Sequence, residues 1–223
     1  MTKEYLDQQS QYWEQSFKNN TEMFGHEPSK AAKYTLNFLK KKIKTFSKKK
    51  KFELLELGAG LGRDTKHIIT ETSSINITAL DYSSEAIKII KQKTSGLESV
   101  RTKVWDVRKG LPFKENTFNG CFSHMLYCMA LTTKEIINLN KEVKRILKPG
   151  GLNIFTVRHT GDGDYKNGEH IGEDLYQNDG FIVHFFSKDK IKEISEGFSI
   201  ESINEFEEGK FPRRLFIVTS RKK

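Results

Sequence analysis

Short apolar runs alternate with amphipathic stretches along most of the chain from Phe52 onward. Apolar runs of this length are typical of buried strands, and the amphipathic stretches between them are typical of helices that cover a sheet. The expected strands, in chain order, are residues 52–57, 75–80, 100–105, 118–125 and 152–157. The alternation predicts βαβ units, and therefore an α/β fold with a mostly parallel sheet. The run 118–125 is apolar on both faces, which places it in the interior of that sheet.

Helix signals fill the intervals between these strands. Ser83 or Ser84 can cap a helix that Gly96 stops. Residues 132–135 have the Thr-x-x-Glu form of a capping box, and apolar residues follow at helical spacing. That helix is expected to end at the turn formed by residues 148–151.

Both ends of the chain lie outside this central pattern. Residues 5–46 predict two helices packed outside the sheet, and apolar residues follow one face of the first. That face, most simply docked on the core, consists of Tyr5, Leu6, Tyr12, Trp13 and Phe17. At the other end, Ser187 begins a helix over 187–196, and apolar runs at 198–206 and 215–220 predict a closing antiparallel pair.

The chain has 223 residues, of which 36% are hydrophobic, and this is enough to bury one substantial core. We therefore expect a single domain over residues 1–223. Its expected parts are an N-terminal helical cap over 1–50, a core over 51–157, a connection over 158–186, and a C-terminal helix with the strand pair over 187–223.

The net charge of +9 invites a nucleic-acid interpretation, because basic surfaces attract phosphate backbones. The excess is local: eight lysines and no acidic residue lie from Lys40 to Lys51, and the rest of the chain carries only +1. Ile43 and Phe46 interrupt these lysines at a spacing that suits a helix end packed on a core. We expect a solvated helix end and linker, with contact to an acidic partner as the alternative. Nucleic acid is therefore not the expected partner.

No stretch approaches the roughly 18 to 20 apolar residues that cross a bilayer, and the start of the chain has no signal-peptide core. Cys121 and Cys128 lie in an apolar segment, without a second Cys or His pair at zinc-finger spacing. We expect them to be reduced core residues, and we expect no metal site. The chain should be a cytoplasmic protein without a membrane partner, either a monomer or a homodimer.

A glycine-rich segment lies where the first strand turns into a helix. Gly58, Gly60 and Gly62 have a G-x-G-x-G spacing, and Glu56 stands two residues before the first glycine. Glycines at such a turn let the backbone approach a ligand closely. A dinucleotide fingerprint would need its third glycine at the position of Arg63. The pattern therefore favours a different ligand, with a purely structural glycine-rich turn as the alternative.

Further motifs follow this segment in order. Asp81 ends the second strand, where a carboxylate can accept both hydroxyls of a ribose. Asp106 follows the third strand, residues 123–125 end the fourth, and residues 147–151 precede the fifth. With these motifs, residues 52–155 resemble the class I S-adenosylmethionine-dependent methyltransferase family.

That resemblance implies an enzyme that uses S-adenosyl-L-methionine and has a Rossmann-like fold. The fold is a mostly parallel seven-stranded sheet, with one antiparallel strand and helices on both faces. The resemblance also implies that Asp106 accepts the adenine amino group while the Val107 amide donates to the ring. The cofactor-binding residues that it implies are Glu56, Gly58, Ala59, Gly60, Gly62, Arg63, Asp81, Tyr82, Asp106, Val107, Ser123 and His124. One departure is Asn119, at a position where the family often has an acidic residue.

Methyl transfer needs little from the protein beyond a nucleophile held in line, about 3 Å from the methyl group. The pocket walls must therefore select the acceptor, and the connection over 158–186 is the best candidate for a lid. Histidines could take a proton from the acceptor, although hydrogen-bonded loop histidines are the alternative. The candidate catalytic residues are His124, His159 and His184. The candidate substrate contacts are Trp13, Phe24, Tyr127, Arg158, His159 and His184.

The expected acceptor is a small-molecule nucleophile, namely a thiol, an amine or a metalloid. The Tyr12–Trp13 helix, the loop 23–25 and the ending 211–219 resemble the small-molecule branch that includes tellurite-resistance and thiopurine-type methyltransferases. One alternative is an RNA or protein methyltransferase, although residues 123–126 lack the Asp/Asn-Pro-Pro-Tyr motif of many base-amine enzymes. The other alternative is a non-catalytic S-adenosylmethionine binder that regulates a partner.

Overall fold

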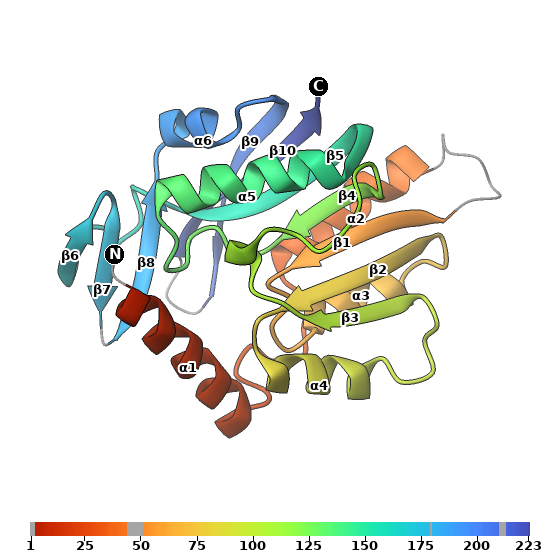
Figure 1. Ribbon diagram of the computed structural model, residues 1–223, viewed down its shortest axis with the longest axis horizontal. Helices are drawn as coiled ribbons and strands as arrows, with labels where there is room; N and C mark the ends of the chain where they lie inside the picture. The colour runs from red at the N-terminus through yellow and green to blue at the C-terminus, as the bar shows by residue number, and fades with distance from the viewer. Residues whose placement is uncertain (1–2, 44–50, 179, 210–212) are drawn as a thin grey trace.

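A computed structural model describes residues 3–43, 51–178, 180–209 and 213–223, with side chains from residue 8 onward (Figure 1). The helices are α1 (Lys3–Asn19), α2 (Lys30–Ile43), α3 (Arg63–Thr70), α4 (Ser84–Lys93), the 3-10 turn η1 (Val107–Lys109), α5 (Thr133–Ile146) and α6 (Lys188–Ile194). The strands are β1 (Phe52–Leu57), β2 (Ile75–Asp81), β3 (Val100–Val104), β4 (Phe118–Ser123), β5 (Leu147–His159), β6 (Glu169–Gly172), β7 (Leu175–Asn178), β8 (Phe181–Phe186), β9 (Phe198–Glu208) and β10 (Arg213–Lys222).

In the described part of the chain, the strands form one sheet of ten. Its order is β3-β2-β1-β4-β5-β8-β7-β6, and β10 pairs with both β5 and β9. Strands β1 to β5 run parallel to their neighbours, whereas β10 is antiparallel to β5 and to β9. Strands β1 to β5 with β9 and β10 form the predicted mostly parallel arrangement, but the sheet has ten strands rather than seven, because β6, β7 and β8 extend it. The predicted fold class is confirmed.

Helices cover both faces of this sheet, which explains why its central strands are apolar throughout. Leu55 and Leu57 of β1 belong to the core beneath α5 and α6. Leu54 lies on the opposite face, in the core formed with α2, α3 and α4. Figure 1 shows α5 in front of the sheet and α2 and α3 behind it. A strand buried on both faces has no polar alternation, as the sequence pattern indicated.

The carboxyl ends of the parallel strands meet at one edge of the sheet, and helix α1 lies across this edge. In Figure 1, α1 extends from the β7–β8 hairpin to α4. At one end, Gln9 Nε2 donates to the Gly180 carbonyl at 2.6 Å. Further along, Glu14 Oε1 accepts the Ser84 hydroxyl at 2.6 Å. The N-terminal helix thus joins two parts of the molecule that are far apart in sequence.

The helix caps confirm several sequence signals. Ser83 caps α4 by accepting from the Ala86 amide, and Ser187 caps α6. Thr132 and Glu135 form the predicted capping box at the start of α5. The two N-terminal helices are also present as α1 and α2.

Two boundaries differ from the prediction. β5 begins at Leu147 rather than at residue 152, because Leu147 pairs with Phe118 at the start of β4. The connection 158–186, expected as a long loop and a candidate lid, is not a loop, whereas its role as a lid stays a prediction. β6, β7 and β8 form an antiparallel meander, and β8 joins β5 through Arg158 and His159. The apolar side chains of β8 are largely buried, which explains why this strand is part of the core.

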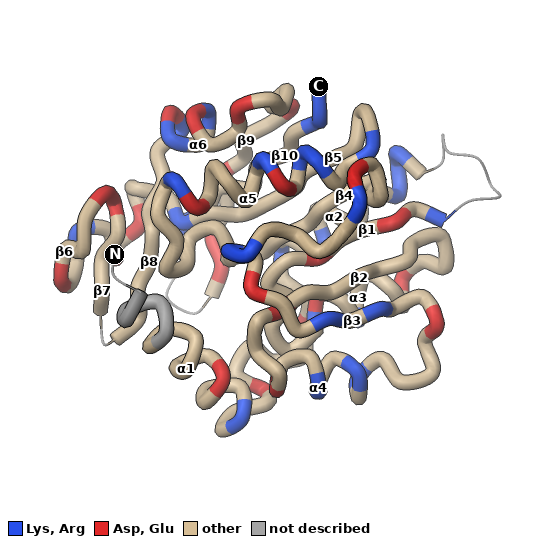
Figure 2. Tube along the Cα trace, in the orientation of Figure 1, with Lys and Arg blue, Asp and Glu red and all other residues tan. Residues whose placement is uncertain are grey.

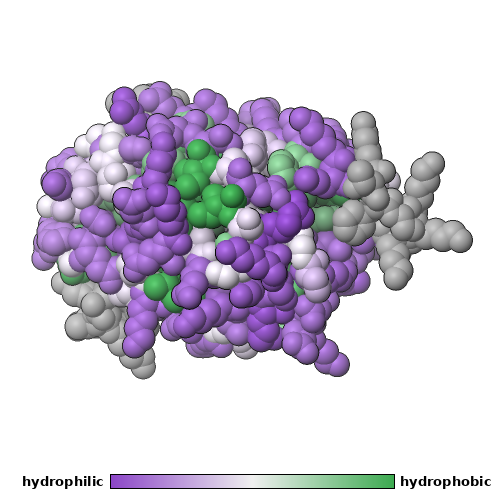
Figure 3. Space-filling model, turned by 90° about the horizontal axis from the view of Figure 1, so that it is seen from above, coloured by the Kyte–Doolittle hydropathy of each residue, from purple (hydrophilic) through white to green (hydrophobic). Residues whose placement is uncertain are grey.

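The described surface is polar and carries both signs of charge. Figure 2 shows Lys and Arg at the end of α2 and at the C-terminus, and Figure 3 shows a mostly hydrophilic face broken by a limited hydrophobic patch. None of the helices among the described residues is long and apolar enough to span a membrane.

Cys121 and Cys128 are both free and buried, as predicted. Part of the lysine-rich stretch, with Phe46, falls outside the described residues, as do the side chains of Tyr5 and Leu6 and part of the 211–219 ending.

Candidate active site

The glycine-rich turn between β1 and α3 is built from backbone that favours glycine. Gly58, Gly60 and Gly62 have φ angles of 68°, 51° and 73°, in the left-handed region. A Cβ at Gly62 would come within 2.6 Å of Ile90, and one at Gly58 within 3.0 Å of Leu126. At Gly60 the nearest side-chain atoms are 3.7 Å away or more. Gly58 and Gly62 are therefore closed in by packing, whereas a Cβ at Gly60 would make ordinary van der Waals contact with Phe24 and Phe17.

Asp81 at the end of β2 is fixed against this turn. Its Oδ2 accepts from the Gly60 amide at 2.8 Å, and its Oδ1 accepts from the Ser83 amide at 2.9 Å. Burial raises the pKa of Asp81, the two amide donors lower it, and the balance is about 6. Each oxygen keeps a further lone pair, so the carboxylate can still accept hydroxyl donors.

Glu56 lies at the end of β1 but faces α3. Its Oε2 accepts the Thr65 hydroxyl at 2.6 Å, and the residue is 3% exposed. Burial raises the pKa of Glu56 to about 8, in spite of the hydrogen bond from Thr65. The side chain ties β1 to α3 in this structure, and its contact with a cofactor stays a prediction.

The adenine-side residues predicted from the sequence lie in the neighbouring turns. Asp106 caps η1 and forms a bidentate pair with Arg108, with N···O distances between 2.6 and 3.0 Å. A ligand amino group would therefore share these oxygens with Arg108. Tyr82 is largely covered, and its hydroxyl donates to the Gln9 carbonyl of α1 at 3.4 Å.

A cavity of about 590 Å³ lies between α1 and the β2–α4 turn. Glu14 and Gln11 of α1 line it together with Tyr82 and Ser84. The sequence analysis missed Glu14 and Gln11. Their spacing on the helix was the available signal, because it places them on one polar face of α1.

An aromatic cluster, formed by Trp13, Phe17, Phe24 and Phe181, stands beside the glycine turn. The Trp13 ring lies 5.3 Å from both Phe17 and Phe181 and 6.2 Å from Phe24, between centroids. Phe24 supplies the side-chain atom nearest to Gly60, and Arg63 Nη1 donates to the Phe24 carbonyl at 2.8 Å. The structure thus brings Trp13, Phe24 and Arg63, all singled out by sequence, to one side of the turn.

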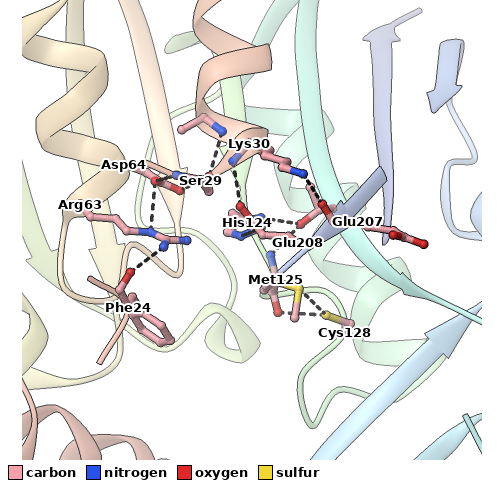
Figure 4. Close-up of polar contacts among 12 residues, drawn as sticks. Phe24, Ser29, Lys30, Arg63, Asp64, His124, Met125, Cys128, Glu207 and Glu208 are labelled. Atoms are coloured by element: carbon pink, nitrogen blue, oxygen red, sulfur yellow. Dashed lines mark hydrogen bonds and ion pairs between the residues drawn. The ribbon is translucent and has the colours of Figure 1, made fainter. Parts of the chain in front are cut away.

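His124 follows β4 on the other side, where both of its ring nitrogens are engaged (Figure 4). Nδ1 is 3.0 Å from Thr156 Oγ1, which also accepts from the Met125 amide at 2.8 Å. Nε2 is 3.0 Å from Glu208 Oε2. Because Glu208 is an acceptor, Nε2 must carry a proton and donate.

Glu208 is the acidic partner of His124. Burial raises the pKa of Glu208, but the hydrogen bond and charge of His124 and the Lys30 amide lower it to about 2. The Lys30 amide donates to Glu208 Oε1 at 2.8 Å. Glu208 and Thr156 were missed by the sequence analysis, since each comes from a distant strand without a local motif.

Three predicted acceptor contacts are corrected by their surroundings. Tyr127 is fully buried, stacks on Phe155 with centroids 4.5 Å apart, and donates to Asn140, so it is a core residue. Arg158 is buried in pairs with Asp162 and Asp164, which neutralise it internally and leave no exposed head for an anionic substrate.

His184 is the third predicted acceptor contact that its surroundings correct. It is fully buried, with Nδ1 2.7 Å from the Leu131 carbonyl and Nε2 2.7 Å from Lys190 Nζ. Burial, followed by the charge of Lys190, lowers the pKa of His184 to about 4. It therefore cannot act as an exposed base.

His159 packs on Phe216, with ring centroids 4.2 Å apart, and accepts from the Gly161 amide, so its contacts belong to the β5–β10 region.

Comparison with known proteins shows which proteins this chain resembles. Residues 54–151 match the family described as "Methyltransferase domain". The malonyl-[acyl-carrier protein] O-methyltransferase 2 of Ilyobacter polytropus is 30% identical over 106 residues, or 48% of this chain and 39% of that protein. The tRNA(Thr) (cytosine(32)-N(3))-methyltransferase of Saccharomyces cerevisiae is 27% identical over 204 residues, or 85% of this chain and 32% of that protein. The chain thus spans about a third of the length of these relatives.

A solved structure extends the likeness to almost the whole chain. The 1,6-didemethyltoxoflavin-N1-methyltransferase of Burkholderia thailandensis superposes with a TM-score of 0.73 at 17% identity, covering 99% of this chain and 89% of that one. Sequence match and fold agree: residues 54–151 match the methyltransferase-domain family, and the fold is that of solved S-adenosylmethionine-dependent methyltransferases. The similar proteins include both small-molecule and tRNA methyltransferases.

The residues at the carboxyl edge fit S-adenosylmethionine. The left-handed turn at Gly60 directs its amide to Asp81, and each Asp81 oxygen keeps a lone pair for a ribose hydroxyl. Ser123 Oγ, at the end of β4, is buried and has no hydrogen-bond partner among the described residues. An unsatisfied buried hydroxyl is costly, and a ligand that reaches the end of β4 would satisfy it.

Proposed function

We propose that the protein transfers the methyl group of S-adenosylmethionine to a nucleophilic atom of a small molecule. The observation that carries this proposal is the enclosure of the glycine turn. Trp13, Phe17 and Phe24 stand beside Gly60, whose amide donates to the carboxylate of Asp81. An enclosed, aromatic wall suits a small acceptor better than a long polymer.

In this mechanism the cofactor, when bound, supplies an activated methyl group on a sulfonium. Asp81 accepts the ribose hydroxyls, and the Gly60 amide holds that carboxylate in place. The aromatic cluster excludes water and orients the acceptor. His124 holds Thr156 and Glu208 rather than a substrate proton, because both of its nitrogens are engaged. The protein's contribution is therefore mainly binding and orientation.

Within this function we favour the branch that includes tellurite-resistance and thiopurine-type methyltransferases. The Tyr12–Trp13 helix supports this, because it brings Trp13 to the glycine turn together with Phe24. Thiols, amines and metalloid oxyanions are then the acceptors to test first. Two buried, free cysteines suit a reducing compartment such as the cytoplasm, and a monomer or homodimer is our working assembly.

An RNA methyltransferase is the second candidate, and one specific observation favours it. The tRNA(Thr) methyltransferase of Saccharomyces cerevisiae aligns with 85% of this chain, which is more than the aligned share in the malonyl carrier-protein enzyme. A cytosine ring could stack in the same aromatic wall.

A direct screen separates these candidates. The protein is incubated with methyl-labelled S-adenosylmethionine and, in separate reactions, thiols, amines, metalloid oxyanions and bulk tRNA. We expect label in a small-molecule fraction, and no label with the Asp81→Ala variant. Transfer to tRNA alone would overturn the small-molecule proposal, and transfer to no acceptor, with intact cofactor binding, would favour a regulatory binder.

A further inference from the structure

A second pocket lies at the amino-terminal edge of the sheet, opposite the glycine turn. It has a volume of about 340 Å³ and opens between the end of α2, the start of β5 and the end of β10. Lys42, Lys148 and Arg221 line it, together with Asn119 and the Gly150–Gly151 backbone. In Figure 1 these elements meet on the side away from α1. The pocket is thus separate from the proposed active site.

Positive charge converges on this pocket from three elements. None of its lining residues is acidic. The nearest compensation is Glu201, which pairs with Arg221 at 2.6 Å. Lys222 lies close by, donating to the Leu147 carbonyl at 2.6 Å. The surroundings of the pocket are therefore net positive.

Helix capping accounts for only part of this charge. Lys40, Lys41 and Lys42 occupy the last turn of α2, where cations stabilise the helix dipole. Lys148 and Arg221 lie on strands β5 and β10, so the dipole of α2 does not explain their position.

Lys148 is held by a neutral partner, whereas Arg221 is shared between the Gly150 carbonyl and Glu201, and both groups keep N–H donors. Lys148 Nζ donates to Asn119 Oδ1 at 3.0 Å, and Arg221 Nη1 donates to the Gly150 carbonyl at 2.7 Å. An ammonium has three donors and a guanidinium five. These contacts hold the Lys148 ammonium and the Arg221 guanidinium at the pocket, and each group keeps N–H donors for an anionic oxygen.

We propose that this pocket binds a phosphate group, held by Lys42, Lys148 and Arg221. Arg and Lys are the side chains that bind phosphate oxygens, and the pocket has room for more than one phosphate. The phosphate belongs either to a free nucleotide or to a nucleic-acid backbone. The site is independent of the proposed methyl transfer, because it lies at the other edge of the sheet.

The test uses the full chain and inorganic tripolyphosphate as the probe, measured by calorimetry at low salt. Lys42→Gln with Lys148→Gln should weaken tripolyphosphate binding roughly tenfold, because two charge-assisted contacts are lost. The control is Lys91→Gln with Lys134→Gln, which removes the same charge from two exposed helix positions. S-adenosylmethionine affinity should be unchanged in both double variants, which also shows that they are folded.

The two sources of phosphate are distinguished by competition. Displacement of tripolyphosphate by a short uridine oligonucleotide would identify a nucleic-acid backbone, and displacement by ATP alone would identify a free nucleotide. The proposal fails if the unaltered protein does not bind tripolyphosphate. It also fails if the control variant loses as much affinity as the pocket variant, since diffuse charge would then explain the binding.

Discussion

The side chain of Asp81 illustrates how single residues prepare the cofactor edge. Desolvation penalises its charge, and the Gly60 and Ser83 amides offset part of that penalty. The same two bonds hold the carboxylate in one orientation before any ligand arrives. A ribose would then gain two charge-assisted hydrogen bonds without the entropy cost of ordering the side chain.

Replacing Asp81 by Ala should therefore weaken S-adenosylmethionine binding strongly. The loss of two charge-assisted bonds should cost about 2 to 3 kcal/mol, measured by calorimetry. Asp189→Ala, which removes an exposed carboxylate of α6, serves as the control and should bind normally. Equal affinities in the two variants would show that the ribose lies elsewhere.

Glu208 gives a pH-dependent prediction. Its pKa is lowered from an ordinary value of 4.5 to about 2, so the ionised form stabilises the folded state above pH 4.5. Glu208→Gln should lower the free energy of unfolding by about 1 to 2 kcal/mol at neutral pH. The difference should shrink as the pH falls from 4.5 towards 2, because both proteins then lack the charge. Denaturant titrations across this pH range measure it.

The neighbouring Glu207 provides the control for that experiment. Its side chain is half exposed and pairs with Arg214 at 3.4 Å on the surface. Glu207→Gln should change the free energy of unfolding by less than about 0.5 kcal/mol. A similar loss in both variants would mean that the bond between His124 and Glu208 contributes little.

The structure brings together the predicted site residues that a local motif marks, and their contacts with a ligand stay predictions. The glycines and Asp81 follow from the spacing around the first two strands. Tyr127, Arg158 and His184 were assigned wrongly, because sequence gives the side-chain type but not its burial. Arg158, for example, looks available until Asp162 and Asp164 fold back on it.

Among the elements, α1 and β8 differ in how firmly they are held. β8 is paired on both sides, with β5 and β7, and its side chains are largely buried. α1 contacts the body mainly through side chains, including Gln9 and the aromatic cluster. Local opening should therefore be easier for α1 than for β8.

Hydrogen exchange tests this difference. α1 and residues 20–25 should exchange quickly in the free protein and slow down when S-adenosylhomocysteine is added, because closure over the cofactor orders them. β8 should be protected in both states, in contrast to a mobile lid. Protection of α1 that is already complete without ligand would argue for a rigid, open pocket.

The element pattern was largely predictable, and the exception has a physical cause. Strands β1, β2 and β4 are short, largely apolar and buried runs, so the hydrophobic pattern alone identifies them. β6 and β7 contain Glu169, His170, Gln177 and Asn178, and their partly exposed positions give no apolar run. Such strands are defined by their pairing with β8, which only the fold provides.

At the scale of the whole molecule, the two edges of the sheet have different chemistry. The carboxyl edge gathers Asp81, Glu56 and Glu208 beside aromatic side chains. The amino edge gathers Lys42, Lys148 and Arg221 around a pocket without acidic lining residues. The parallel strands present their starts to the amino edge and their ends to the carboxyl edge, whereas the antiparallel β10 brings Arg221, near its end, to the amino edge.

The contacts of α1 also have a consequence for how the molecule is made. Gln9 and Gly180 are 171 residues apart, and Glu14 and Ser84 are 70 apart. During synthesis, α1 leaves the ribosome long before the β7–β8 hairpin exists to receive it. Contacts of such long range form late, because the loop between them must first be closed. The glycine turn and Asp81 can thus assemble with β1 and β2 while the aromatic cluster is still incomplete. The carboxyl edge of the nascent chain would therefore stay uncovered until the β7–β8 hairpin has formed.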